Sequence, residues 1–318
     1  MRSKNFRDFE AFAATVRDVD CVMTIQNPVH HLWSITQVKL GGMDLQLGKL
    51  GSGNIVEGQS MQDGYVLYLP LSDRIEYSAN GTVLDTNSFA ILEPGSEFCV
   101  STRFEHDWCS MFIPTSMLDQ AGGPDAPQLG SRKSICRVTR ANRELANSAR
   151  SIMSEIMSAS ASFRGFESSP AAISGAEALM KVASLVIGDK QEDEPDHTGR
   201  PRVSRSDIIR RSKKLLARRT GKIVRVNDLA AAAGVSERTL RAAFIEYFGT
   251  GPVHYLQLRQ LHQVRHALQA ADPEAASVSD VLTEHNVWEF GRFAARYRRL
   301  FGECPSESLQ AAEPGRSV

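Results

Sequence analysis

The chain has 318 residues, of which 42% are hydrophobic and 23% charged, a composition that suits two globular domains and excludes a disordered or fibrous chain. Basic and acidic side chains number 37 each, but residues 1–200 carry 18 basic and 25 acidic ones, whereas residues 201–318 carry 19 and 12. The net charge is therefore −7 in the front part and +7 in the back part. We expect only the back part to meet a polyanion.

The N-terminal stretch MRSKNFRDFEAFAATVRDVD is too charged and too acidic for a signal or transit peptide, and no run of about 18 apolar residues predicts a membrane span. Five cysteines without CxxC spacing fit a reduced, cytoplasmic protein better than a disulfide framework or a zinc site. A redox pair such as Cys99 with Cys109 is an alternative to buried, unreactive thiols.

The front part changes its hydrophobic period after a short first element. Residues 5–17 predict an amphipathic helix, because Phe6, Phe9 and Val16 fall on one side. Residues 20–114 predict short strands with frequent turns, since apolar and polar side chains alternate around Met43 and the Asn80-Gly81 pair is a strong hairpin signal. An antiparallel β-sandwich or β-barrel follows.

Residues 137–187 turn to a helical period and predict a pair of helices, packed on the β-domain or forming a dimerisation surface. Both roles are compatible. Residues 188–202 are polar and broken by Gly and Pro, so they predict a linker. The expected organisation is an N-terminal domain over residues 1–187, a C-terminal domain over residues 203–311 and a tail over residues 312–318.

Residues 226–248 predict a helix-turn-helix. A short helix ends at Gly234, which suits the left-handed turn after a helix, and Ser236 then caps a second helix. The second helix buries Leu240, Phe244 and other apolar residues on one side and turns its arginines away from that side. Two short helices around a Gly-containing turn place the second helix in a DNA major groove.

A second helix-turn-helix is predicted over residues 277–301. Phe290, Phe293, Tyr297, Leu300 and Phe301 lie in one sector of its last helix and anchor it, whereas the arginines face outward. Between the two units, residues 253–270 predict a helix of about 27 Å, long enough to hold two recognition helices close to one DNA turn, about 34 Å, apart. The C-terminal domain is thus expected to be all-α, and the whole chain an α+β multidomain protein.

Residues 205–309 resemble the AraC/XylS family of bacterial transcription regulators, most closely its XylS-like branch in the wording GRFAARYRRLFGECPSESL. The positions that carry the resemblance are Phe244, Gly249, Pro252, Tyr255, Leu256 and Arg259 in the first half and Phe293, Tyr297, Phe301, Gly302 and Pro305 in the second. The resemblance implies paired helix-turn-helix units behind an N-terminal cupin-like β-domain that senses a small molecule and helps dimerisation.

Matching to that family assigns the DNA contacts. The positions implied to contact DNA are Ser236, Arg238, Thr239, Arg241 and Ala242 in the first unit and Gly291, Arg292, Ala295, Arg296 and Arg299 in the second, with Arg296, Arg298 and Arg299 expected at phosphates. The chain departs from the family at Asn286-Val287, where Gly-Phe is usual, and at Leu282, where Ala is usual. Asn tolerates the left-handed conformation, so we expect the turn to survive.

The β-domain offers few metal ligands. His30 and His31 are adjacent and would point opposite ways on a strand, and His106 stands alone, so neither a cupin metal site nor any other cofactor is expected. A small β-domain can hold one small ligand. Since some XylS-like relatives sense aromatic carboxylates, the side chains considered for binding an acidic effector are His31, Lys39, Arg74 and Arg103.

These observations predict a cytoplasmic, dimeric transcription regulator that binds double-stranded promoter DNA, responds to a small effector and activates RNA polymerase. Enzyme activity is not expected, because no P-loop, GxSxG or GxGxxG motif is present. Two alternatives stay open: a redox- or metal-responsive sensor, and a DNA-binding protein without small-molecule control.

Overall fold

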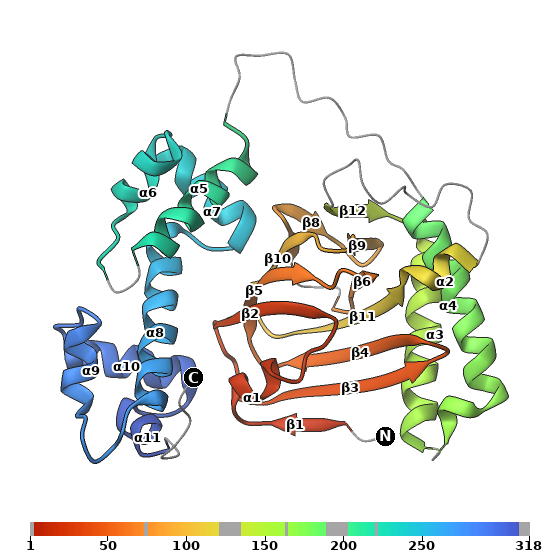
Figure 1. Cartoon of the computed structure of the whole chain (residues 1–318), viewed down its shortest axis with the longest axis horizontal. Helices are drawn as coiled ribbons and strands as arrows, with labels where there is room; N and C mark the ends of the chain where they lie inside the picture. Colours follow the sequence, from red (N-terminus) through yellow and green to blue (C-terminus); the bar gives the residue numbers. More distant parts are fainter. Residues whose placement is uncertain are drawn as a thin grey trace.

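The structure, a computed structural model, describes residues 3–72, 76–120, 135–162, 165–188, 203–219 and 222–311, with the backbone alone for residues 119–120. The expected linker, apart from Gly188, and the tail lie outside these ranges. Within them, a strand-rich domain lies beside a helical one, and helices cover the far side of the strands (Figure 1).

The N-terminal domain is an antiparallel β-sandwich of two open sheets. In the described residues one sheet has seven strands, in the order β1 (Lys4–Phe6), β3 (Trp33–Leu40), β4 (Met43–Leu50), β11 (His106–Pro114), β6 (Gly64–Pro70), β9 (Ser88–Leu92) and β12 (Cys136–Arg140). The other has five, in the order β2 (Val19–Gln26), β5 (Gly53–Ser60), β10 (Glu97–Thr102), β7 (Tyr77–Ala79) and β8 (Thr82–Leu84). The sandwich confirms the expected fold of this half.

Turn chemistry explains the tightest hairpin. Asn80 and Gly81 join β7 to β8 with φ values of 48° and 86°, both in the left-handed region that a two-residue hairpin turn demands. The Asn80-Gly81 prediction is therefore confirmed. Between the sheets, Val66, Phe98 and Phe112 belong to one buried apolar cluster.

Helices α3 (Arg143–Ser162) and α4 (Pro170–Gly188) pack on the seven-stranded sheet. The short helix α2 (Thr115–Gln120) precedes them in the chain, and the 3₁₀ helix η1 (Phe166–Ser168) lies between them in sequence. Leu179 of α4 and Met153 of α3 are buried with Leu67 and Met111 of the sheet. Helix α4 is long and apolar enough to cross a membrane by length and composition alone. Its packing against α3 and the sheet explains the same composition, since a helix that covers a sheet also needs a broad apolar face.

Two predicted boundaries were wrong. Residues 4–6 form β1, and the first helix, α1, covers only Phe9–Ala13. Residues 136–140 form β12, although a helix was predicted from residue 137. In both cases pairing decides the structure, because β1 joins the edge of β3 and β12 the edge of β9. His30 and His31 lie in the bend between β2 and β3, so the prediction that they alternate on a strand was also wrong.

The C-terminal domain is all-α, as predicted. Its helices are α5 (Arg205–Arg218), α6 (Val226–Ala233), α7 (Glu237–Phe248), α8 (Pro252–Ala270), α9 (Val278–Glu284), α10 (Phe290–Phe301) and α11 (Pro305–Gln310). Helix α8 runs between α5–α7 at one end and α9–α11 at the other (Figure 1). Ile208 and Leu216 of α5 are buried with Leu229 of α6 and Leu240 of α7, so α5 completes the core of the first unit.

Candidate nucleic-acid interface

The first recognition helix, α7, begins and ends as its sequence predicts. Gly234 has a φ of 71° after α6, and the Ser236 side chain accepts a hydrogen bond from the Thr239 amide at 3.2 Å. Leu240 and Phe244 are buried, whereas Arg238, Arg241 and neighbouring Ala242 are exposed. The helix therefore presents two exposed arginines and a small residue to a partner, with Thr239 half-buried beside them.

The second recognition helix, α10, separates charge from apolar surface in the same way. Phe293, Tyr297, Leu300 and Phe301 are buried, and Tyr297 Oη lies 2.7 Å from Ser308 Oγ of α11. Besides Phe290, the exposed positions of α10 are Gly291, Arg292, Ala295, Arg296, Arg298 and Arg299. Phe290 was predicted to be an anchor, but as the first helical residue it keeps 37% of its surface exposed.

The turn of the second unit keeps its shape despite the departure from Gly-Phe. Asn286 has a φ of 58°, in the left-handed region, and Val287 and Leu282 are buried, with 6% and 2% exposure. The expectation that Asn would support the turn is confirmed. Both units thus place a helix with an exposed arginine face behind a left-handed turn, and Ser236 caps the first of these helices.

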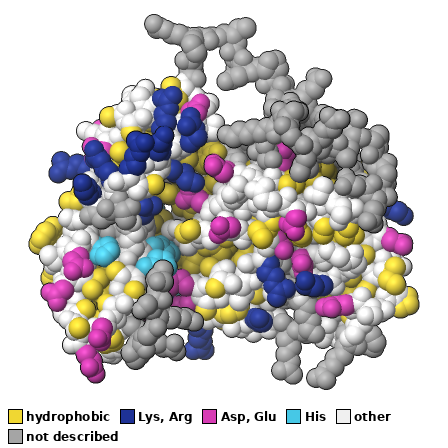
Figure 2. Space-filling model, in the orientation of Figure 1, with side chains coloured by type: hydrophobic (Ala, Val, Ile, Leu, Met, Phe, Trp, Pro, Cys, Tyr) yellow, Lys and Arg dark blue, Asp and Glu magenta, His cyan; other side chains and the backbone are white. Residues whose placement is uncertain are grey.

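Positive charge gathers over the first unit. In Figure 2 Lys and Arg side chains concentrate over α5, α6 and α7, at the upper left of the view. A cleft of about 410 Å³ lies between this unit and the second one, and its lining includes Arg219, Lys222, Arg225 and Arg259. Lys222 and Arg225 stand in a loop and were not singled out in the sequence, and Arg259 entered only as a position of the family resemblance. The signal that could have found them is a stretch of sequence without acidic side chains. Among the described residues, Arg219 is the one of these four side chains with an acidic partner, Asp228 at 3.5 Å.

The β-domain contacts the far ends of both recognition helices. At α7, Ser78 Oγ donates to the Glu246 carbonyl at 3.0 Å and Ser101 Oγ to the Tyr247 carbonyl at 3.1 Å. Next to them, Arg103 packs against Gly249, the left-handed residue that ends α7. These bonds satisfy carbonyl oxygens that have no partner within the last helical turn.

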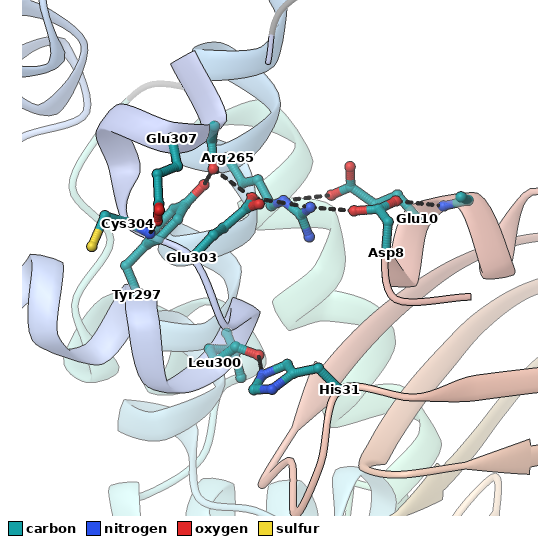
Figure 3. A network of polar contacts seen from close by, with 11 residues as sticks. Asp8, Glu10, His31, Arg265, Tyr297, Leu300, Glu303, Cys304 and Glu307 are labelled. Atoms are coloured by element: carbon teal, nitrogen blue, oxygen red, sulfur yellow. Dashed lines mark hydrogen bonds and ion pairs between the residues drawn. The ribbon is translucent and has the colours of Figure 1, made fainter. Parts of the chain in front are cut away.

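At α10, His31 makes the equivalent contact, with Nε2 3.2 Å from the Leu300 carbonyl and its ring against Gly302 (Figure 3). One further contact joins the N-terminal arm to the connecting helix. Arg265 of α8 is buried and contacts Asp8 and, at 3.2 Å, Glu303 (Figure 3). Burial lowers the pKa of Arg265, but the charges of Glu10, Asp8 and Glu303 outweigh it and raise the pKa.

The three described residues among the four considered for an effector are not brought together. His31 and Arg103 face the recognition helices, and Lys39 is 71% exposed beside Asp44, at 3.8 Å. Arg74 lies outside the described residues. None of the three described side chains lines the cavity between the sheets.

That cavity has a volume of about 50 Å³ and draws its lining from both sheets. Tyr68 and Trp108 stack at 5.9 Å, and most neighbours are apolar; the polar ones are Arg17, Asn54 and Ser110. Burial raises the pKa of Tyr68 well above its ordinary value, so the phenol is neutral and can donate. The lining resembles that of a small-molecule site, but the volume lies far below the roughly 300–1,000 Å³ of such sites, so an organic ligand would require the two sheets to move apart.

Cys99, Cys109 and His106 are buried within the N-terminal domain. Cys99 approaches the Tyr247 carbonyl at 3.8 Å and Cys109 the Met153 sulfur at 3.3 Å, so the two thiols face different elements and form no redox pair. Burial raises the pKa of Cys109 to about 12. Burial lowers the pKa of His106 to about 4, and among the described residues no group of three or more His, Cys, Asp or Glu is placed to hold a metal.

Comparison with known protein families and sequences gives matches to part of the chain. The model of a helix-turn-helix domain family matches residues 229–311. Over 86 residues the chain is 35% identical to the XylDLEGF operon transcriptional activator 2 of Pseudomonas putida, and over 110 residues it is 30% identical to the probable thc operon regulatory protein of Rhodococcus erythropolis. These matches cover 27% and 35% of this chain, and only 55% and 33% of the two relatives.

Two solved structures align over most of the chain at low similarity. The AraC-like transcriptional activator CuxR aligns with 89% of this chain and 99% of its own, with a TM-score of 0.43 and 14% identity. ToxT from Vibrio cholerae aligns with 94% and 99%, with a TM-score of 0.30 and 9% identity. Residues 229–311 are therefore a helix-turn-helix domain, and the chain is similar to transcription regulators of the AraC/XylS type.

Proposed function

We propose that this protein is a sequence-specific regulator that binds promoter DNA and activates transcription in response to a small molecule. The observation that carries the proposal is the pair of recognition helices, each with a buried apolar face and an exposed arginine face. Arginine is the commonest side chain to read guanine, through its O6 and N7 atoms. Relatives that match 27% of this chain are described as operon activators, which supports the sign of regulation.

The proposed division of labour follows from exposure and position. Arg238 and Arg241 of α7 and Arg292 of α10 read base edges near the beginning of each helix, where the small Ala242, Gly291 and Ala295 let the backbone approach. Arg296 and Arg299, further along α10, contact phosphates. Ser236 and Thr239 bind phosphate or base oxygens beside the first helix.

Control by a ligand is proposed to act through the contacts of the β-domain with both recognition helices. A ligand between the sheets would move β10 and β11, the strands that carry Ser101 and Trp108. Ser101 also makes the hydrogen bond to α7, so a movement of β10 would reach the recognition helix. A ligand can change DNA binding only if it binds one arrangement of the β-domain and the recognition helices more tightly than another. The apolar lining, with Arg17 at one side, suits an aromatic or other organic acid.

The decisive experiment measures binding of the purified protein to its own upstream DNA and to a scrambled duplex over a salt series. Replacing Arg238 or Arg292 by Ala should cost about 1–3 kcal/mol on the specific duplex and relax preference at one base pair. Replacing Arg143, an exposed arginine of α3, is the matched control and should change neither affinity. Equal affinity of the wild type for both duplexes would overturn sequence-specific regulation.

A second experiment tests the ligand. Benzoate and medium-chain carboxylates should raise the melting temperature of the wild type, and Val56→Phe, which fills the cavity, should remove the shift while DNA binding persists. The control is Val83→Phe, at an exposed position of β8. An identical shift in Val56→Phe would place the ligand elsewhere, and binding without any ligand response would favour a DNA-binding protein without small-molecule control.

A homodimer is proposed to form through α4. Ile173 and Leu185 are 57% and 62% exposed on that helix, more than an isolated core helix needs. Ile173→Lys with Leu185→Lys should shift the sedimentation of the protein from dimer to monomer. Activation of transcription would also require the regulator to contact RNA polymerase, and this contact is part of the proposal.

A further inference from the structure

Trp288 is an exposed tryptophan at the entrance to the second recognition helix. The sequence contains three tryptophans, of which Trp33 and Trp108 are 1% and 5% exposed, whereas Trp288 is 71% exposed. Trp288 follows the buried Val287 and stands two residues before Phe290, where α10 begins. A large aromatic ring gains much by leaving water, and Trp288 is open to a partner outside the chain.

The surroundings of Trp288 favour DNA as that partner. Arg292, Arg296 and Arg299 are all exposed on the helix that Trp288 precedes, and they complement a polyanion. A Cβ built at Gly291 would meet no atom within 4 Å, so the backbone at the beginning of α10 is open to close approach. Ala295, one turn further on, is exposed and small as well. An apolar ring beside arginines and small residues suits the floor of a major groove better than an acidic or apolar protein surface.

The only apolar group that a base edge offers in the major groove is the C5-methyl group of thymine. We infer that Trp288 is a specificity-determining residue that packs on a thymine methyl in the half-site read by α10. The inference rests on the proposed function, because it needs the second unit to sit in a major groove. It adds an apolar reader to the arginine readers and explains how α10 reads sequence although Arg292 is held by Glu289, at 3.2 Å, in the free protein.

The first test uses the fluorescence of Trp288. Since the other two tryptophans are buried, acrylamide should quench mainly Trp288 in the free protein. A specific duplex, selected by the wild type from a random-sequence pool, should protect this emission, and a scrambled duplex should protect it less. Trp288→Phe should abolish the quenchable component. Trp288 that stays fully quenchable in the specific complex overturns the inference and leaves a protein partner as its occupant.

The second test removes the methyl group. Each thymine of the selected site is replaced in turn by deoxyuridine, and one replacement should weaken wild-type binding about fourfold, which corresponds to one buried methyl group of ~0.8 kcal/mol. Trp288→Ala should weaken binding to the thymine site roughly tenfold and lose nothing further on the uracil site. Trp288→Phe should keep part of the methyl preference. The control is Val83→Ala, an exposed apolar residue of β8, which should behave as the wild type.

The outcomes separate the two proposals. If the selection yields no preferred sequence, the proposed function fails. If a preferred sequence emerges but Trp288→Ala responds to uracil as the wild type does, the regulator stands and the thymine contact is wrong. A loss of affinity that is equal on specific and scrambled duplexes also overturns the thymine contact. Unchanged urea midpoints for the Trp288 variants would show that each result comes from a folded protein.

Discussion

His31 of the β-domain holds the last turn of the second recognition helix, with its Nε2 3.2 Å from the carbonyl oxygen of Leu300. Since a carbonyl oxygen only accepts, the hydrogen bond requires the ring proton on Nε2. The same ring packs on Gly302, whose φ is 81° and where a Cβ would lie 3.1 Å from the ring. The end of α10 is therefore shaped by two demands, a left-handed backbone and room for His31.

A double-mutant cycle separates these demands. Gly302→Ala should cost about 1–2 kcal/mol for the left-handed backbone and more for the crowded ring. His31→Ala should cost about 1 kcal/mol for the lost hydrogen bond. In the double variant the crowding is relieved. Its loss of unfolding free energy, measured by urea unfolding, should therefore be smaller than the sum of the losses in the two single variants. Strict additivity would mean that His31 and Gly302 do not interact in solution.

A second prediction concerns Tyr255 of α8, whose Oη donates to Glu57 Oε2 of β5 at 3.0 Å. The other oxygen of Glu57 lies 2.9 Å from Lys213 Nζ of α5. Burial lowers the pKa of Lys213, but the charge and hydrogen bond of Glu57 outweigh it and raise the pKa. Burial, with the charge of Glu57, raises the pKa of Tyr255 well above its ordinary value. Both groups thus depend on one carboxylate that comes from the other domain.

Tyr255→Phe and Glu57→Ala should each lower the free energy of unfolding, and their coupling should be about 1.5 kcal/mol, the value of a hydrogen bond to a charged group. Glu57→Gln should keep an acceptor for Tyr255 and lose only the attraction to Lys213. The measurement is urea unfolding of the full chain. A coupling near zero would show that the domains separate without using this contact.

The helix-turn-helix units could be predicted closely because their signals are local. Gly234 at the turn, Ser236 at the cap and Pro252 at the beginning of α8 each act within one helical turn, and the observed helices begin and end at these residues. The short edge strands could not, because β12 and β1 exist only through pairing with strands distant in sequence.

The contacts of His31 and Arg103 with the recognition helices could not be predicted from the sequence either. A basic side chain in a β-domain suggested a ligand for an acid, but His31 meets a residue 269 positions away. The cavity lining, including Tyr68 and Trp108, alternates along strands as any core does. Nothing in a single strand distinguishes a residue that faces a cavity from one that faces a packed side chain.

A third prediction concerns the turn of the second unit. Asn286→Ala puts a residue with no special tolerance at a φ of 58° and should cost about 1–2 kcal/mol. Asn286→Gly removes that strain and should cost less than Asn286→Ala. Urea unfolding gives the free energies, and DNA binding of folded Asn286→Ala tells whether the turn aims α10. Equal costs for Ala and Gly would show that the side chain of Asn286, and not its backbone, supports the turn.

The last prediction is a dependence of stability on pH that comes from His262 of α8. Burial, followed by the charges of His266 and Arg265, lowers the pKa of His262 to about 3. Its Nε2 has no hydrogen-bond partner among the described residues, and its ring meets Phe301 of α10 edge-on at 5.1 Å. A proton on this imidazole would place a positive charge beside Arg265 in an apolar contact.

The sign follows from the two states. In the unfolded chain the histidine takes up a proton near its ordinary pKa of 6.5, whereas in the folded protein it does so only near 3. Between these values the unfolded state binds more protons, so the free energy of unfolding falls as the pH is lowered. The contribution of His262 is at most about 1.4 kcal/mol per pH unit. It is fully present above pH 6.5 and is lost as the pH falls toward 3.

Other groups titrate in the same window, so the comparison between variants decides the test. His106, whose pKa is lowered to about 4, acts in the same direction, whereas Asp18, raised to about 6 by burial and by Asp44, acts in the opposite one. His262→Gln should flatten the pH dependence of urea unfolding between pH 6.5 and 4, and the exposed His254→Gln should leave it unchanged. If His262→Gln keeps the wild-type slope, the imidazole titrates in the folded protein as it does in water, and the contact between α8 and α10 is open to solvent.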